Sequence, residues 1–174
     1  MADIYISESD MMFGPFPTDR VFCIEKSDLY EHKYRQNGIK TCEFILLRDG
    51  KLYFVEAKKS CPNHNAQEEN EEKRIKYDAY IRDIPQKMRD SLDIYSSLLL
   101  KKNGSADLPT GMMLGDLSEH EIRLVLVVKN AQKDWLKHYQ EKFQEILRRE
   151  MRIWKIPSFI VLTEDDAKKK HLIS

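Results

Sequence analysis

The most regular hydrophobic pattern of the chain lies in residues 41–59, TCEFILLRDGKLYFVEAKK. Two apolar runs flank Asp49-Gly50, and this dipeptide is typical of a type I′ turn because both central residues of that turn need φ > 0. Within each run, both sets of alternating positions are hydrophobic. Strands with this pattern are buried on both faces. The pattern therefore predicts a β-hairpin inside a sheet that carries a layer on each side.

A two-residue turn also fixes the register of this hairpin. Residues opposite each other are counted outward from the turn, which places Glu43 opposite Glu56. Lys58 lies two residues beyond Glu56 and therefore on the same face of its strand. A bulged three-residue loop would instead shift the pairing by one residue and place Glu43 opposite Val55. The candidate site thus depends on the geometry of one turn.

The rest of the chain alternates between strand and helix patterns. Residues 77–98 and 131–154 each carry an apolar stripe at helical spacing, and 164–171 begins with acids and ends with lysines, as a short helix favours. Short apolar runs predict strands at 4–6, 20–26, 121–129 and 158–163. Met11–Pro17, with two prolines and a glycine, is predicted to be irregular. Pro85 predicts a kink, or two abutting helices, within the first stripe.

Residues 27–38 allow two interpretations. Ser27 can cap a short helix over residues 28–36 that ends at Asn37-Gly38. Alternatively, a strand leads into a second hairpin at Asn37-Gly38. The pattern favours the helix.

This order of elements defines an expected fold class. The chain is predicted to be mixed α/β (α+β), with a central mixed sheet that contains an antiparallel hairpin and is flanked by helices. The final strand–helix–strand unit predicts a parallel pair with a right-handed crossover. With 174 residues, the chain is expected to form one domain over 1–174, with its core at about 20–163.

Composition narrows the class of protein. Charged residues make up 33% and hydrophobic residues 41%, which is typical of a soluble globular protein. The 29 basic and 29 acidic residues balance, so there is no overall basic signature of nucleic-acid binding. No apolar run is long enough to span a membrane, and the first residues lack a signal-peptide pattern. Three cysteines without CxxC spacing favour a reducing cytoplasm.

The charged end of the predicted hairpin is the candidate site. Two opposed carboxylates at the end of buried strands are unfavourable unless they are paired or bind a cation. Glu25 would join them if its strand is an antiparallel neighbour of the strand that Glu43 begins. The competing interpretation is a structural ion pair in which Lys58 bridges one glutamate at the rim of the sheet.

An acidic residue early in one strand, a tight hairpin, and Glu-x-Lys late in the next strand, followed by a helix and a further strand, resemble the PD-(D/E)xK nuclease superfamily, which has the restriction-endonuclease-like fold. The matching residues are Glu43 and Glu56-Ala57-Lys58. The resemblance covers about residues 20–129 by topology and three residues by motif. The chain departs from the family pattern in that Glu43 replaces the usual Asp and Cys42 the usual Pro. Glu25 stands in for the family's additional Glu.

The resemblance implies a metal-dependent nuclease that hydrolyses phosphodiester bonds of DNA or RNA. Glu43, Glu56 and Lys58 would be catalytic, and Glu43, Glu56, the Ala57 carbonyl and Glu25 would hold Mg²⁺ or Mn²⁺, which prefer oxygen ligands. Lys58 would act on the developing phosphorane charge. The alternative function is a non-catalytic α/β module with a nuclease-like fold that binds protein or nucleic acid.

The expected partners follow from these two functions. Nucleic acid is the predicted substrate, and a homodimer or protein partner would supply target recognition. One face of the first long helix carries basic residues that could follow a phosphate backbone. Acidic residues alternate with them and weaken this patch. The basic residues are Arg74, Lys76, Arg82, Lys87 and Arg89.

Overall fold

The computed structural model describes residues 2–104, 107–113 and 117–174, which form two sheets packed with helices. The strands are β1 (Asp3–Glu8), β2 (Met11–Pro17), β3 (Val21–Phe22), β4 (Phe44–Arg48), β5 (Lys51–Lys58), β6 (Glu121–Val128) and β7 (Phe159–Thr163). The α-helices are α1 (Glu71–Leu99), α2 (Lys133–Ile146), α3 (Arg148–Ile153) and α4 (Glu164–Lys169). Single helical turns are η1 (Thr18–Arg20), η2 (Ile24–Lys26), η3 (Tyr30–Tyr34), η4 (Arg35–Asn37), η5 (His64–Ala66), η6 (Thr110–Met112) and η7 (Leu117–Glu119).

The central sheet has five strands in the order β3-β4-β5-β6-β7. β3, β4 and β5 are antiparallel neighbours, whereas β5, β6 and β7 run parallel. Helix α1 connects β5 to β6, and α2 with α3 connects β6 to β7. The predicted mixed α/β class, with a hairpin and a final parallel unit, is confirmed.

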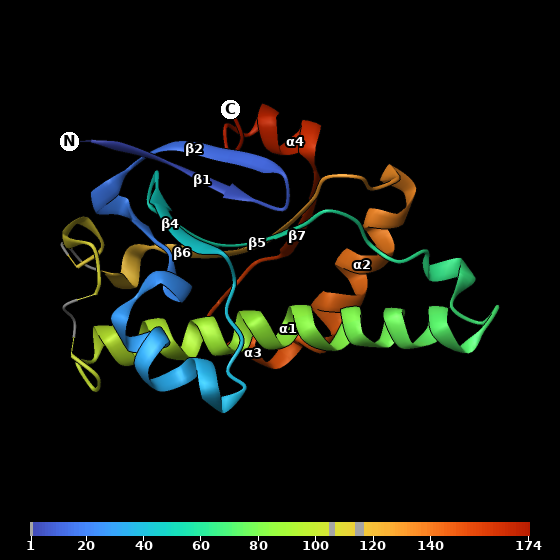
Figure 1. Cartoon of the computed structure of the whole chain (residues 1–174). Helices are drawn as coiled ribbons and strands as arrows, with labels where there is room; N and C mark the ends of the chain where they lie inside the picture. The colour runs from blue at the N-terminus through green and yellow to red at the C-terminus, as the bar shows by residue number, and fades with distance from the viewer. Residues whose placement is uncertain (1, 105–106, 114–116) are drawn as a thin grey trace.

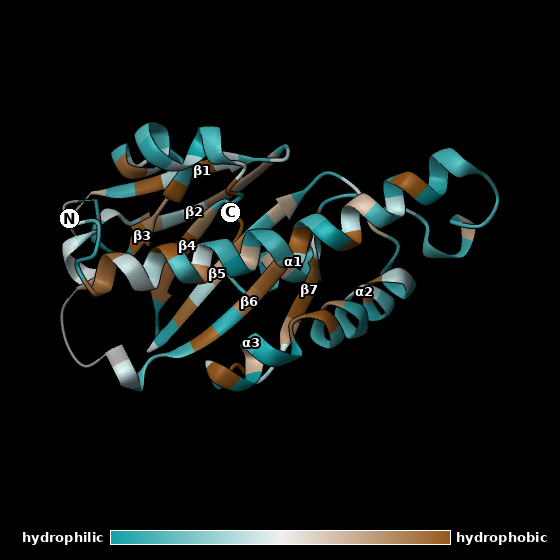
Figure 2. Ribbon diagram, turned by 90° about the horizontal axis from the view of Figure 1, so that it is seen from below, coloured by the Kyte–Doolittle hydropathy of each residue, from teal (hydrophilic) through white to brown (hydrophobic). Residues whose placement is uncertain are grey.

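A layer covers each face of this sheet (Figure 1). The β1–β2 hairpin and α4 lie on one face, and α1, α2 and α3 lie on the other. Figure 2 views the second face, where α1 crosses the strands. Two apolar clusters fill the interfaces, and alternate residues of β4 and β5 belong to alternate clusters. Burial on both faces explains why the hairpin sequence is apolar at nearly every position.

The turn between β4 and β5 has the predicted type I′ character. Asp49 and Gly50 both have positive φ, 51° and 68°. The register runs from Arg48↔Lys51 to Phe44↔Val55, as a two-residue turn requires. The bulged alternative is therefore wrong over the length of β4.

The irregular conformation predicted for Met11–Pro17 is wrong, because this segment is strand β2 and pairs with β1. Phe13 and Phe16 are buried and their rings pack on Phe44 of the central sheet. A strand in a two-stranded sheet keeps one edge unpaired and so tolerates proline there. The burial of Phe13 and Phe16 outweighed the glycine and proline between them.

The strand predicted over 20–26 is also mostly wrong. Only Val21–Phe22 pair with β4, and the chain then turns through η2. Ile24 is fully buried there, which draws the backbone away from the sheet edge. Glu25 consequently lies on a helical turn and not on a strand.

The helix favoured over residues 28–36 is confirmed as irregular helical turns, η3 and η4, and the second-hairpin alternative is wrong. The Ser27 hydroxyl accepts a hydrogen bond from the Tyr30 N–H at 3.2 Å. Gly38 ends the segment in the left-handed conformation, with φ of 70°.

The long helices differ from prediction at their interruptions. Helix α1 continues through Pro85, which is buried, so the alternative of two abutting helices is wrong. The predicted 131–154 helix is instead divided into α2 and α3 at the buried Leu147. Thr163 caps α4, and its hydroxyl accepts a hydrogen bond from the Asp166 N–H at 3.1 Å.

Candidate functional site

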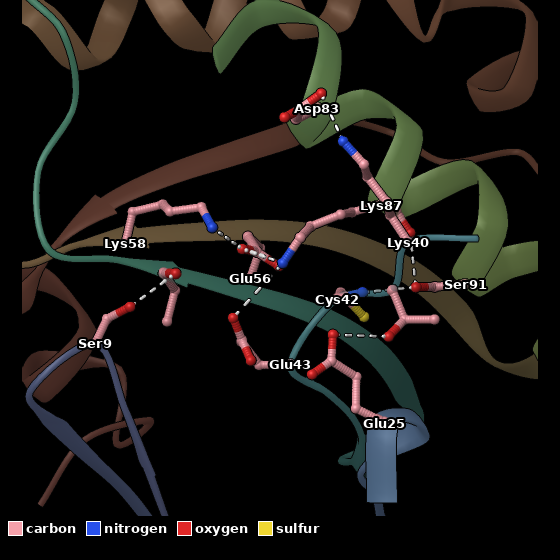
Figure 3. A network of polar contacts seen from close by, with 12 residues as sticks. Ser9, Glu25, Lys40, Cys42, Glu43, Glu56, Lys58, Asp83, Lys87 and Ser91 are labelled. Carbon is pink, nitrogen blue, oxygen red and sulfur yellow. Dashed lines mark hydrogen bonds and ion pairs between the residues drawn. The ribbon is translucent and has the colours of Figure 1, made fainter. Parts of the chain in front are cut away.

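The site is centred on Glu56, a carboxylate with no solvent exposure on the face of β5 that α1 covers (Figure 3). Two ammonium groups neutralise it. Lys58 Nζ lies 2.8 Å from Glu56 Oε1. Lys87 Nζ, from α1, lies 2.9 Å from Oε1 and 3.1 Å from Oε2. A buried carboxylate with two cationic donors satisfies the requirement that interior charges be paired.

Glu43 lies beside this group, directly before β4. Its N–H donates to the Val55 carbonyl at 2.9 Å, so Glu43 departs from the regular ladder that begins at Phe44. Its Oε1 is nevertheless 3.8 Å from Lys87 Nζ. Figure 3 shows the Glu43 and Glu56 carboxylates both facing that ammonium group. The structure thus brings together Glu43, Glu56 and Lys58, with Lys87 between the two glutamates.

Helix α1 holds the segment that carries Glu43. The Cys42 N–H donates to Ser91 Oγ at 2.8 Å, and Ser91 Oγ donates to the Lys87 carbonyl at 2.7 Å. The Lys40 N–H donates to Asp90 Oδ2 at 2.9 Å. The Glu43 side chain is therefore positioned by the same helix that supplies Lys87.

Burial and neighbouring charges shift the pKa values of Glu43 and Lys87. Burial, followed by the charge of Glu56, raises the pKa of Glu43 to about 8, although Lys87 partly opposes this. Burial opposes the charged form of Lys87, but Glu56 and Glu43 outweigh it and raise the pKa of its ammonium. Lys87 is therefore charged at neutral pH, whereas Glu43 is largely protonated. Lys58 and Lys87 match Glu43 and Glu56 in number, but Lys87 approaches Glu43 only to 3.8 Å.

The other two predicted ligands, Glu25 and the Ala57 carbonyl, each have a hydrogen-bond partner of their own. Glu25, on η2, accepts a hydrogen bond from Thr41 Oγ1 at 3.4 Å. The Ala57 carbonyl accepts from Ser9 Oγ, in the β1–β2 turn, at 3.0 Å. Within residues 2–104, 107–113 and 117–174, no three His, Cys, Asp or Glu side chains form a group that could hold a metal ion. The structure therefore does not assemble Glu25, Glu43 and Glu56 into a three-carboxylate set.

A divalent cation fits the remaining donors in chemical type. Two carboxylates and the Ala57 carbonyl offer hard oxygen ligands. The 13% exposed Glu43 side chain has Lys87 as its ion-pair partner, at the long distance of 3.8 Å. A bound cation would supply a closer positive charge for Glu43 and so favour its ionised form. Lys87 is its competitor, since this ammonium already contacts both carboxylates.

Lys87 was predicted to lie on the basic outer face of the first long helix, and this was wrong, because its side chain is 16% exposed and directed onto the sheet. The signal was present in the sequence. Lys87 is three residues after Ile84 and four before Ser91, both of which are buried, and residues at this spacing share a helix face. Ser91 was also not predicted to contribute to the site, although it shares this helix face with Lys87.

The rest of that basic face is paired with acidic neighbours. Arg74 pairs with Glu71, Lys76 with Glu72, Arg82 with Asp83 and Arg89 with Glu150. Most of these charges are therefore compensated within the protein.

The chain matches no protein-family model, no curated protein and no solved structure. The class that the geometry defines is a mixed α/β fold with a buried glutamate–lysine cluster where an antiparallel hairpin meets a parallel sheet. Across the part of the chain described, no helix has the length and apolar character needed to cross a bilayer.

Proposed function

We propose that the protein is a metal-dependent phosphodiesterase that acts on DNA or RNA. The observation that carries this proposal is that the carboxyl groups of Glu43 and Glu56 both face Lys87, with Lys58 also on Glu56, at the end of a hairpin that precedes a helix and a parallel strand. This is the arrangement that the sequence resemblance implies. A protein with a merely structural ion pair has no need for the second, poorly neutralised carboxyl group of Glu43.

In this proposal Glu43, Glu56 and the Ala57 carbonyl hold Mg²⁺ or Mn²⁺. When bound, such a cation activates water and shields phosphate charge. Lys58 is 33% exposed, more than the other charged groups that contact Glu56, and so can reach a phosphodiester from solvent. It would neutralise charge that develops there. Lys87 orients Glu56 through its two hydrogen bonds, and Glu25 lies outside this ligand set.

The proposal extends to partners and location. We expect a homodimer or a protein partner to contribute target recognition. The three cysteines, Cys23, Cys42 and Cys61, are free, which supports a cytoplasmic location.

A second candidate function is a non-catalytic module that binds protein or nucleic acid. One observation favours it: the Lys87 ammonium already contacts both carboxylates. Under this candidate function, Lys87 permanently replaces a cation, and the cluster serves only to fix α1 on the sheet.

Substituting Lys87→Met and titrating Mn²⁺ separates the two functions. A phosphodiesterase site should bind Mn²⁺ more tightly after the competitor is removed, and Mn²⁺ should restore much of the thermal stability that the variant loses. Lys76→Met removes an exposed lysine of the same helix and should leave Mn²⁺ affinity unchanged. If Mn²⁺ at millimolar concentration neither binds nor stabilises Lys87→Met, the metal site is refuted.

Cleavage of fluorescent DNA and RNA oligonucleotides in Mn²⁺ then tests the activity itself. Glu56→Gln should lose both Mn²⁺ binding and cleavage. Lys58→Met should keep Mn²⁺ binding and lose cleavage. Wild-type protein that binds Mn²⁺ but cleaves neither substrate would contradict the phosphodiesterase and favour the binding module.

A further inference from the structure

A second candidate site lies on the opposite face of the central sheet. Lys51 and Tyr53 alternate with Glu56 along β5, so their side chains point to the other face. That face is covered by the β1–β2 hairpin and α4 (Figure 1). Near the beginnings of β5, β6 and β7 this face instead borders a cavity of about 280 Å³. The cavity shares no lining residue with the glutamate cluster.

The cavity is strongly cationic. Arg48, Lys51, Arg123 and Lys170 line it, and no Asp or Glu does. Arg123 pairs with Glu121. Among the residues that the structure describes, the one ion-pair partner of Arg48 is Asp49, which is 86% exposed and 4.0 Å away. Over the described ranges, neither Lys51 nor Lys170 forms an ion pair, so the rim of the cavity carries an excess of positive charge.

The floor of the cavity is largely apolar. Tyr53 and Ile160, both half-buried, lie on it together with other hydrophobic side chains of the parallel strands. A largely apolar floor with a few charged groups at the rim is typical of sites that bind small organic ligands.

One wall of the cavity is fixed in place. The Arg48 guanidinium donates to the carbonyls of His171, at 2.8 Å, and Lys170, at 3.0 Å. It also lies over the Tyr53 ring, 5.4 Å from the ring centroid. These contacts tie the segment after α4 to the end of β4. A site whose walls are already ordered loses less conformational entropy when it binds.

We propose that this cavity binds a small organic anion that places a phosphate group on the cationic rim and a flat ring on the apolar floor, namely a nucleoside monophosphate. The volume of about 280 Å³ is slightly below the usual range of ligand pockets, which excludes large cofactors. Arginine and lysine are the side chains that recognise phosphate, and unpaired ones recognise it best. This inference does not depend on the proposed phosphodiesterase.

Calorimetric titration with AMP, adenosine and inorganic phosphate, without divalent cations, tests the proposal. AMP should bind at least about tenfold more tightly than either fragment, since a charged hydrogen bond accounts for about that factor. If phosphate binds as tightly as AMP, the apolar floor contributes nothing. If adenosine binds as tightly as AMP, the cationic rim contributes nothing to the affinity. Either outcome, or no binding of AMP, overturns the proposal.

Variants locate the binding site. Lys51→Gln combined with Lys170→Gln should weaken AMP binding about tenfold or more. The matched control combines Lys76→Gln with Lys137→Gln, exposed lysines of α1 and α2, and should bind AMP as the wild type does. Equal weakening in both pairs would indicate a general charge effect and overturn the proposal.

Glu56→Gln should bind AMP as tightly as the wild type. Loss of AMP binding in Glu56→Gln, with retention in the Lys51/Lys170 variant, would place AMP at the glutamate cluster and overturn the proposal. The AMP-binding proposal can therefore fail independently of the proposed phosphodiesterase, which is tested with Mn²⁺ and oligonucleotides.

Discussion

Lys87 Nζ lies 2.9 Å and 3.1 Å from the two carboxylate oxygens of Glu56, so a helix and the central strand of the sheet are joined by one buried ion pair. The pair connects α1 to a charge with no solvent exposure. Without Lys87, the buried Glu56 carboxylate would keep Lys58 as its counter-charge but lose two hydrogen bonds, and breaking a buried ion pair is strongly destabilising.

Lys87→Met should therefore destabilise the metal-free protein by about 3–5 kcal/mol. The methionine keeps most of the buried volume, so the loss reports the missing charge. Urea unfolding followed by circular dichroism measures it. Lys76→Met removes an exposed ion pair with Glu72 and should change stability by less than about 1 kcal/mol. Equal effects in the two variants would show that Glu56 does not depend on Lys87.

Glu43 predicts an unusual pH dependence. Its folded-state pKa is raised to about 8 from an ordinary value of 4.5. The native state therefore retains a proton that the unfolded state has released between these values, so its contribution to stability, complete below pH 4.5, is lost as pH rises toward about 8. The loss is on the order of a few kcal/mol.

Glu43→Gln, which cannot ionise, should lack this loss. Its thermal midpoint should fall less than that of the wild type between pH 5 and pH 8.5, about the range in which the raised carboxyl titrates. Glu31→Gln, at an exposed and ion-paired glutamate, is the control and should follow the wild type. Parallel curves for wild type and Glu43→Gln would show that Glu43 ionises normally.

The neutral hydrogen bond between Ser91 and the Cys42 N–H should contribute to stability. Ser91→Ala removes the acceptor of the buried Cys42 N–H and should cost about 1–3 kcal/mol in the free energy of unfolding. Ser96→Ala, one turn and a half along α1, removes only a bond to the Leu92 carbonyl and should cost less. Because Cys42 precedes Glu43, Ser91→Ala should also weaken Mn²⁺ binding if the proposed metal site exists. Similar stabilities for both variants would contradict the positioning role of Ser91.

The two stacked imidazoles of His64 and His138, with ring centroids 4.1 Å apart, predict acid sensitivity. Burial, the neighbouring His64 and Lys142 lower the pKa of His138 below its ordinary 6.5. The unfolded chain thus gains a proton first as the pH falls below 6.5, and stability is lost as the pH falls further through the folded-state pKa.

His138→Gln should flatten the fall in thermal midpoint between about pH 7 and pH 5, where an unperturbed histidine titrates. Replacing the exposed His32 with glutamine should leave the fall unchanged. An unaltered pH profile in His138→Gln would assign the acid sensitivity to other groups.

The hairpin was predictable because its register follows from one local turn. Its strands are apolar on both faces, which requires a sheet that is covered on both sides. The pairing of Phe44 with Val55 is therefore as predicted. Glu43 departs from the predicted register, since its N–H donates to the Val55 carbonyl and the regular ladder begins only at Phe44. The long-range contacts of Lys87 could not be derived in the same way, since helix spacing gives the face of a residue but not the side chain that it meets on another element.

β2 and Glu25 show where local signals mislead. The aromatic residues of β2 are buried on a sheet whose position the local sequence does not encode, and this burial overrides proline and glycine. Glu25 was assigned to a strand by its apolar neighbours, yet the buried Ile24 turns the chain inward. Both outcomes depend on tertiary packing, which single-sequence periodicity does not contain.

The central place of β5 in the sheet divides the candidate site into two zones of backbone exchange. Residues 51–55 of β5 pair with β4 on one side and β6 on the other, and residues 56–58 pair with β6, so these amides should exchange with solvent only when the whole sheet opens. The residues from η2 to Glu43 follow a two-residue edge strand and can open locally. A ligand that bridges the two zones would slow deuterium uptake in residues 24–43 and leave residues 51–58 unchanged.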